Sequence, residues 1–251
     1  MSLPLVLKKE DGFYSIPLFR ELGLRAVFTT RKYNMGFPAP GRKRLGFFRK
    51  QAYKKIGLTY SRLVCPSQVH GDTVFIAGPE DRGRGVYTRS NAIPRTDALI
   101  TNQRHLPLAI LTADCLPVFI FDNDKKAIAV VHAGWKGLHQ QIIAKTIRRM
   151  CQVFKVSPED LIIAIGPGIR PCCYEVGKDF LTYFKAGISR KGSKIYFDLA
   201  QAAGSQMKDA GVRADHIYDS HICTSCMNSE FFSYRREGEA AGRSMAVMEL
   251  Q

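Results

Sequence analysis

The chain has 251 residues, 45% of them hydrophobic, so it is long enough to bury a sizeable core. Its 37 lysines and arginines outnumber its 22 acidic residues, and the formal net charge of +15 suits either a polyanion or a small anionic substrate. The basic residues are scattered and no nucleic-acid motif accompanies them, which disfavours a nucleic-acid partner.

The cysteines and the apolar runs indicate where in the cell the protein is expected to be. The 7 cysteines, an odd number without a signal-peptide pattern, indicate reduced thiols in a cytoplasmic protein. The central apolar run lies within residues 106–138, contains Asp114 and two prolines, and is too short to cross a bilayer. We therefore expect no membrane partner. No Pro/Ser-rich linker separates an independent half, so we expect a single domain over residues 1–251, with a monomer favoured.

Short strands separated by turns are predicted over the first part of the chain. The predicted strands lie within residues 1–24, 25–31, 62–69, 73–77 and 96–101. Residues 42–57 have the spacing of an amphipathic helix whose basic face is either solvated or a phosphate-contact surface. Residues 83–94 form a flexible loop by composition, of the kind that often rims an active site.

The segment 106–138 organises the rest of the chain. Two apolar runs flank a polar turn at 123–126, which predicts a buried hairpin. This hairpin places Cys115 and His132 at the same end of neighbouring strands. A thiolate and an imidazole there can share a metal ion or act as nucleophile and base, although either residue can also be an ordinary core or edge residue.

A third residue strengthens the metal interpretation. His70 ends the Gln-Val-His-Gly segment, and two histidines with one cysteine give the ligand count of catalytic zinc sites, with one position open. Asp97 precedes an apolar run and is either a partner that orients a metal-bound histidine or a plain turn carboxylate.

Helices and strands alternate irregularly over residues 138–250. We expect helices over 138–154, from Ser157 onward, and over 177–187 and 198–211, with Asp198 as an N-cap. Strands are predicted at 161–165 and 215–222, and 231–236 is expected to pair with 243–250. Short strands interspersed with helices indicate an α+β fold with mixed sheets rather than a doubly wound one.

Four further cysteines have no assigned role. Cys172 and Cys173 are adjacent and are expected to point in different directions, which disfavours a shared metal. Cys223 and Cys226 form one Cys-x-x-Cys that lacks a matching partner. It is interpreted as structural, with a redox-sensitive pair as the alternative.

Several motifs together resemble the YfiH family, also called the laccase-domain or polyphenol oxidoreductase family. These motifs are Gln-Val-His-Gly, Thr-Ala-Asp-Cys-Leu-Pro-Val, His-Ala-Gly-Trp-Lys-Gly, Ile-Gly-Pro-Gly-Ile-Arg-Pro-Cys-Cys-Tyr-Glu-Val and Phe-Phe-Ser-Tyr-Arg-Arg. They run in the family's order from about residue 25 to the C-terminus. The resemblance implies a four-layer α/β/β/α arrangement.

The same resemblance implies a zinc-dependent purine nucleoside phosphorylase. Such an enzyme converts adenosine, inosine or methylthioadenosine and phosphate to the free base and the corresponding ribose 1-phosphate, with adenosine deamination as a second activity. The metal ligands would be His70, Cys115 and His132, with Zn²⁺ expected and Cu²⁺ as the alternative, and the catalytic group would comprise Cys115, Asp114 and His132. Candidate substrate and phosphate contacts are Arg31, Asn34, Gln68, Lys136 and Arg235.

Two departures from the family pattern put substrate choice in doubt. Lys136 stands where the family often has arginine, so bidentate phosphate binding is lost there. The loop between Arg31 and Asn34 is shorter than usual, which should open or reshape one wall of the pocket. Three alternatives remain, namely a copper-binding polyphenol oxidase, a cysteine hydrolase and a basic polyanion-binding protein.

Overall fold

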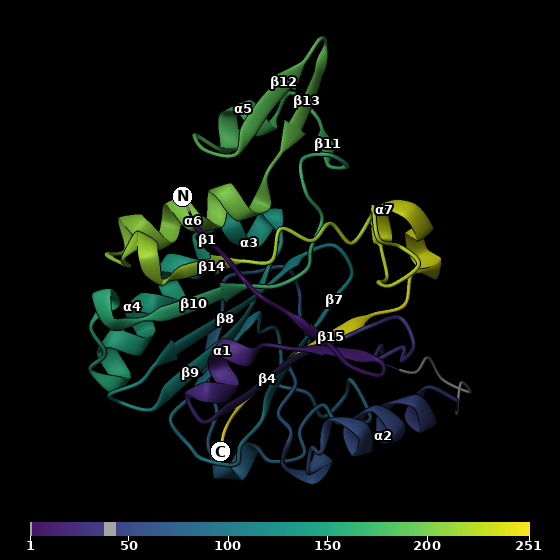
Figure 1. Cartoon of the computed structure of the whole chain (residues 1–251), viewed down its shortest axis with the longest axis vertical. Coiled ribbons are helices and arrows are strands. Elements are labelled where there is room, and N and C mark those ends of the chain that lie inside the picture. Colours follow the sequence, from purple (N-terminus) through teal and green to yellow (C-terminus); the bar gives the residue numbers. More distant parts are fainter. Residues whose placement is uncertain (1, 38–43) are drawn as a thin grey trace.

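Two β-sheets lie face to face between helices in the computed structural model, which describes residues 2–37 and 44–251 (Figure 1). The seven-stranded sheet has the order β1 (Leu3–Pro4), β14 (Ile217–Asp219), β10 (Ile162–Ile165), β8 (Leu116–Asp122), β9 (Ala127–Ala133), β6 (Ala98–Thr101) and β5 (Val74–Ile76). The five-stranded sheet has the order β2 (Lys8–Lys9), β3 (Phe13–Ser15), β4 (Leu24–Thr29), β15 (Ser244–Leu250) and β7 (Leu108–Thr112). Both parallel and antiparallel neighbours occur in the larger sheet, so the predicted mixed α+β class is confirmed.

A small third sheet and seven helices complete the described architecture. The small sheet has the order β11 (Glu175–Val176), β13 (Lys194–Phe197) and β12 (Ile188–Lys191), and it projects from the stacked sheets (Figure 1). The helices are α1 (Pro17–Glu21), α2 (Arg44–Ile56), α3 (Trp135–His139), α4 (Ile142–Phe154), α5 (Phe180–Tyr183), α6 (Leu199–Asp209) and α7 (Tyr234–Glu237). Short 3₁₀ turns span Tyr60–Arg62, Pro79–Asp81, Pro158–Asp160, Ala214–His216 and Gly238–Ala240. Within the described ranges, no helix combines the length and the apolar character that a membrane crossing requires.

Successive side chains along the central strands point to opposite faces of the sheet, so each strand contributes to two different layers of the core. In β8, Val118 and Ile120 belong to the core shared with α4 and α6, whereas Phe119 and Phe121 face the other sheet. In β15, Val247 belongs to the cluster that includes α2. Strands that are buried on both faces require continuous apolar sequence, which these segments have. The four-layer α/β/β/α arrangement implied by the family resemblance is therefore present.

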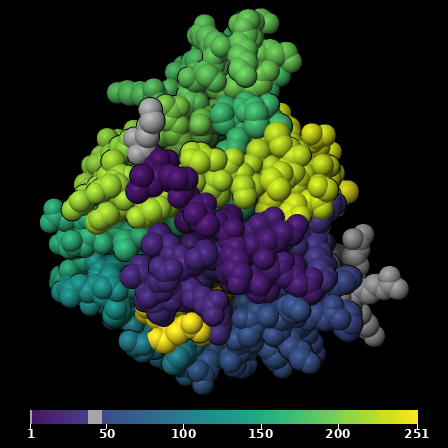
Figure 2. Space-filling model, viewed as in Figure 1, coloured from purple at the N-terminus to yellow at the C-terminus, as the bar shows by residue number. Residues whose placement is uncertain are grey.

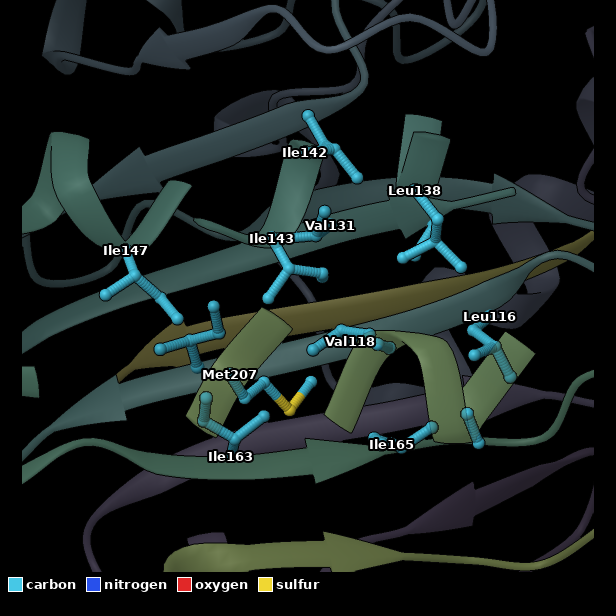
Figure 3. Close-up of a cluster of buried hydrophobic side chains, with 14 of the residues drawn as sticks. Leu116, Val118, Val131, Leu138, Ile142, Ile143, Ile147, Ile163, Ile165 and Met207 are labelled. Carbon is cyan, nitrogen blue, oxygen red and sulfur yellow. The ribbon is translucent and has the colours of Figure 1, made fainter. Parts of the chain in front are cut away.

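Helices α3, α4 and α6 cover one face of the seven-stranded sheet. Figure 3 shows Ile143 and Ile147 of α4 directed at Val118 and Val131 on the strands, with Met207 of α6 beside them. All five side chains are at most 1% exposed. Burying an aliphatic side chain of this size contributes about 1.5–3 kcal/mol, so this layer holds β8 and β9 rigidly in place.

The predicted hairpin has the expected register. Strands β8 and β9 pair antiparallel on either side of the turn at 123–126, with Leu116 opposite Ala133 and Pro117 opposite His132. Cys115, which immediately precedes β8, therefore lies at the same sheet edge as His132. This placement confirms the geometric expectation drawn from the two apolar runs.

The N-terminal segment attaches to both sheets. Strand β1 pairs in parallel with β14, and β2 and β3 extend the five-stranded sheet. Figure 2 shows this segment in purple, crossing the surface beside the yellow C-terminal part of the chain. It covers apolar surface, because Leu5, Tyr14 and Ile16 are buried in the core between the sheets.

Several predicted boundaries differ from the structure. The helix expected over 138–154 is two helices, because Gln141 adopts a left-handed φ of 66° between α3 and α4. The helix expected from Ser157 is a single 3₁₀ turn, and the one expected over 177–187 is reduced to α5.

The segment 231–236 was wrongly predicted as a strand. Residues 231–233 lead into α7 and residues 234–236 lie within it, and the pairing partners of β15 are β4 and β7. Two other helix predictions hold. Asp198 caps α6 as expected, and α2 occupies the part of the predicted helix 42–57 that lies within the described residues, since 42 and 43 lie outside them.

Candidate metal centre

Three predicted ligands meet at the edge of the central hairpin. One ligand atom each from His70, Cys115 and His132 lies within 4.8 Å of the others, and the two imidazole rings are 4.8 Å apart between centroids in an edge-to-face arrangement. His70 reaches the group from a turn in which it adopts a left-handed φ of 59°. Gly134 leaves space for the group, because a Cβ there would lie 2.8 Å from the Cys115 sulfur.

Asp97 holds both histidines of this group. Its Oδ1 lies 2.8 Å from His132 Nδ1 and accepts the His70 backbone N–H at 3.0 Å. Its Oδ2 accepts the backbone N–H groups of Val69 at 3.1 Å and Gly71 at 2.8 Å. The engagement of Nδ1 leaves Nε2 of His132 free to face the sulfur, and a carboxylate in this position fixes both the tautomer and the ring orientation. The geometry therefore favours the orienting role for Asp97 over a plain turn carboxylate.

Charge separation stabilises the thiolate in this group. Burial alone would raise the pKa of Cys115. The charge of His132 and hydrogen bonds from both histidines have a larger, opposite effect and lower this pKa to about 6. Burial lowers the pKa of His132, whereas the Cys115 thiolate and Asp97 raise it to about 9. The Asp97 pKa is lowered overall, because hydrogen bonds and the charge of His132 outweigh its burial. The lowered pKa favours the thiolate, which is the metal-ligating, nucleophilic form of the sulfur.

Asp114 anchors the segment that carries Cys115. Its Oδ1 accepts the Thr224 hydroxyl at 2.6 Å, and its Oδ2 accepts the Ser233 hydroxyl at 3.1 Å and the Arg235 backbone N–H at 2.7 Å. The Asp114 carbonyl accepts the Ile169 N–H at 2.7 Å. Both carboxylate oxygens are therefore engaged within the protein, which favours orientation over proton handling for this residue.

Two side chains that were predicted to contact substrate form hydrogen bonds to the backbone instead. The Gln68 amide donates to Leu111 O and accepts the Leu111 N–H, both at 2.8 Å. Asn34 Oδ1 accepts the N–H groups of Gly36 and Arg243, each at 3.0 Å. These contacts give both side chains a structural role in shaping their loops, and a substrate contact would have to use the Asn34 NH₂ group or the second N–H of the Gln68 amide.

Arg31 lies among residues of the C-terminal segment. Its guanidinium donates to Asn228 O and to Glu237 at 3.2 Å, and it lies 5.3 Å from the centroid of the Phe232 ring. A hollow of about 340 Å³ beside it is lined by Lys9, Glu10, Asp11, Gly12, Thr30, Arg31, Lys32, Ser229 and Glu230. None of the three metal-ligand candidates lines this hollow, so an anion held there would be separate from the centre.

The other two basic candidates flank aromatic rings. Lys136 is exposed on α3, and its ammonium lies 5.6 Å from the centroid of the Trp135 ring. The Arg235 guanidinium lies 5.2 Å from the centroid of the Tyr174 ring and donates to Glu175 O at 2.9 Å. Burial raises the Tyr174 pKa, and the Cys115 thiolate raises it further, which places this phenol within the field of the centre. The sequence marked Tyr174 only as part of a motif.

A second group of possible ligands overturns one expectation. The sulfurs of Cys172, Cys173, Cys223 and Cys226 all lie within 4.8 Å of one another. The expectation that the adjacent pair would point in different directions and that the Cys-x-x-Cys would lack a partner was wrong. The reason is non-local, because the loops that follow β10 and β14 run side by side.

Two stacked sheets carry a possible transition-metal centre at one sheet edge, formed by two imidazoles and one thiolate. Residues 33–251 match the family model described as multi-copper polyphenol oxidoreductase laccase, and the chain belongs to that family. The predicted resemblance is therefore confirmed.

Relatives carry nucleoside-enzyme names. "Purine nucleoside phosphorylase YlmD" of Geobacillus stearothermophilus is 31% identical over 209 residues, which cover 80% of this chain and 76% of that protein. A purine nucleoside phosphorylase of Clostridium acetobutylicum is 38% identical over 167 residues, covering 64% and 70%. "Adenosine deaminase RL5" of an unknown prokaryotic organism is 30% identical over 199 residues, covering 76% and 76%.

Solved structures share the complete fold. YlmD from Geobacillus stearothermophilus superposes with a TM-score of 0.94 at 28% identity and covers 99% of this chain and 100% of that chain. The Bacillus licheniformis hypothetical protein YfiH gives a TM-score of 0.92 at 26% identity, covering 98% and 99%. The chain is thus similar to these proteins along almost its whole length.

The ligand set fits one metal ion rather than several copper ions. A multi-copper oxidase needs many histidines, whereas the chain has 6, and only two belong to a possible metal-binding group within the described residues. Two nitrogens and one sulfur match a catalytic zinc site with an open fourth position. The same donors also bind copper tightly, because affinity peaks at copper along the divalent series.

Proposed function

We propose that this protein is a zinc-dependent purine nucleoside phosphorylase that cleaves adenosine, inosine or methylthioadenosine, with adenosine deamination as a second activity. The observation that carries the proposal is the convergence of His70, Cys115 and His132, held by Asp97, in a chain whose relatives are named for these two activities. A Zn²⁺ ion bound by the three residues would supply Lewis acidity and one exchangeable coordination position.

The remaining roles follow from position and charge. Asp114 holds the Cys115 segment and the Arg235 backbone in a fixed relation through its three side-chain hydrogen bonds. Arg235 and Lys136 would supply positive charge for phosphate, and Arg31, which lies against the C-terminal segment, would supply it at the separate hollow. The formal net charge of +15 favours the approach of an anionic co-substrate.

Product analysis tests the proposed reactions. The zinc-loaded protein is incubated with adenosine, inosine or methylthioadenosine, with and without phosphate, and the products are separated chromatographically. We expect free base and the sugar 1-phosphate only when phosphate is present, as ribose 1-phosphate from adenosine or inosine and as methylthioribose 1-phosphate from methylthioadenosine. Inosine should form from adenosine without phosphate. The matched control is Cys115→Ala, which removes one proposed ligand. Failure of the zinc-loaded protein to exceed this control with every nucleoside would refute the proposal.

A cysteine hydrolase is the second candidate, because the lowered Cys115 pKa and raised His132 pKa describe a thiolate–imidazolium pair. It predicts activity that survives complete metal removal and is lost irreversibly on alkylation. Metal-dependent nucleoside cleavage would exclude it. A phenol oxidase would instead consume oxygen in the copper-loaded form.

The chain is further proposed to act as one cytoplasmic domain, as a monomer. None of the 7 cysteines takes part in a disulfide, which suits a reducing compartment. The core between the sheets joins the N-terminal strands to the central hairpin and to β15, which ties both ends of the chain into one unit. Light scattering of the reduced protein tests the monomer.

A further inference from the structure

The four-cysteine group has the spacing of a tetrahedral thiolate site. Cys226 Sγ lies 3.5 Å from Cys172 Sγ and 3.3 Å from Cys173 Sγ, and all four sulfurs lie within 4.8 Å of one another. Four sulfurs placed about 2.3 Å from a zinc ion at tetrahedral angles are separated by about 3.8 Å. The two shortest separations are slightly below this value and none exceeds 4.8 Å, so a cation could be accommodated by small side-chain movements.

Backbone pairing holds the two loops that carry these sulfurs. Gly168 forms a parallel bridge with Cys223, donates its N–H to Ile222 O at 3.2 Å and accepts the Thr224 N–H at 3.1 Å. The loops are thus aligned without any contribution from the thiols. The gathering of the sulfurs is therefore a consequence of the fold and not of one flexible side chain.

A disulfide accounts for this arrangement less well than a metal. Cys226 lies at nearly equal distances from Cys172 and Cys173, so the structure gives it no single disulfide partner. A tetrahedral cation engages all four. Cys223 is buried at the base of the group, whereas Cys172 and Cys226 are exposed, which gives a metal an entry path.

We propose that Cys172, Cys173, Cys223 and Cys226 bind one Zn²⁺-like cation as four thiolates, in a closed structural site separate from the His70–Cys115–His132 centre. Four protein ligands leave no position for substrate. The site joins the loop after β10 to the loop after β14. Thr224, between two of the ligands, donates to Asp114, so the cation would stabilise the segment that leads into Cys115.

Metal counting on the intact protein separates the two sites. The protein is purified with Zn²⁺ under anaerobic, reducing conditions, and its metal content is measured by elemental analysis and native mass spectrometry. We expect about two zinc ions per chain in the wild type, about one in Cys115→Ala and about one in Cys226→Ser. Cys151→Ser removes a half-buried thiol outside both groups and should retain about two.

Cobalt substitution keeps the test independent of whether Cys226→Ser folds. Co²⁺ bound to Cys115→Ala should give intense thiolate-to-cobalt charge-transfer absorption and the visible bands of a tetrahedral ion. Zinc should displace this spectrum. The proposal is overturned if folded Cys115→Ala binds neither metal, or if the reduced wild-type protein, shown to be competent at the first centre, contains only one. A metal-free wild-type mass lower by two hydrogens, with a disulfide mapped within the group, would overturn it equally.

Discussion

Replacing Asp97 by asparagine tests whether this carboxylate preorganises the metal centre. The carboxylate accepts three backbone N–H groups, from Val69, His70 and Gly71, and contacts the His132 imidazole. An asparagine has only one acceptor oxygen. Whichever way its amide turns, the NH₂ group faces either two backbone N–H donors or one N–H donor and the imidazole.

The expected magnitude follows from these lost contacts. Hydrogen bonds to a charged group contribute about 1.5–3 kcal/mol each, so the loss of two predicts a fall of about 3–6 kcal/mol in the free energy of unfolding. The imidazole also loses the partner that fixes its tautomer. Changes of this kind lower metal affinity by about 10–100-fold. Both effects have the same cause and should appear together in Asp97→Asn.

Chelator competition measures the zinc affinity, and denaturant titration of the metal-free protein measures the stability. Asp81→Asn is the matched control, because Asp81 is also buried and accepts the Gly78 N–H but lies outside both possible metal-binding groups. It should lower stability without changing zinc affinity. A folded Asp97→Asn protein with zinc affinity within about twofold of the wild type would refute the positioning role.

Two other substitutions test packing and capping. Gly134→Ala would place a Cβ 2.8 Å from Cys115 Sγ and 3.3 Å from His70 Cδ2. We therefore expect weaker zinc binding and a loss of about 1–3 kcal/mol in the free energy of unfolding. In the control Gly204→Ala, the new Cβ meets nothing within 4 Å, so zinc binding should be unchanged. Unaltered chelator competition in Gly134→Ala would contradict this close fit. Asp198→Ala removes the α6 cap and should lower the free energy of unfolding by about 1 kcal/mol, whereas Asp198→Asn should cost less. Equal denaturation midpoints for these two variants would argue against the cap.

Local patterns predicted the hairpin and the ligands that it carries. The apolar runs and the polar turn at 123–126 were sufficient to place Cys115 beside His132, because the register of a hairpin depends on nearby sequence. The break at Gln141 was not predictable in this way, since glutamine seldom signals a left-handed residue. The apolar Phe231–Phe232 pair suggested a strand. Both side chains are buried, but they lie in a loop that leads into α7.

Non-local contacts explain the other differences. Cys172 and Cys226 are 54 residues apart, and their approach depends on the parallel pairing of β10 with β14. A spacing rule that looks for two Cys-x-x-Cys motifs misses an adjacent pair combined with one such motif. Similarly, the sequence marked Asp97 as a possible partner of a histidine, but its contacts with three backbone N–H groups required the fold.

Asp114 connects the two groups of metal-ligand candidates. It adopts a φ of 83°, which is unfavourable for a residue with a side chain, and its hydrogen bonds compensate for that strain. Its donors include Thr224 of the four-cysteine loop and the Arg235 backbone, while Ile169 donates to its carbonyl. Because Cys115 is the next residue, movement of either cysteine-bearing loop would change the direction of its sulfur. Metal loss from the four-cysteine group should therefore weaken zinc binding at the other centre, although the two share no ligand.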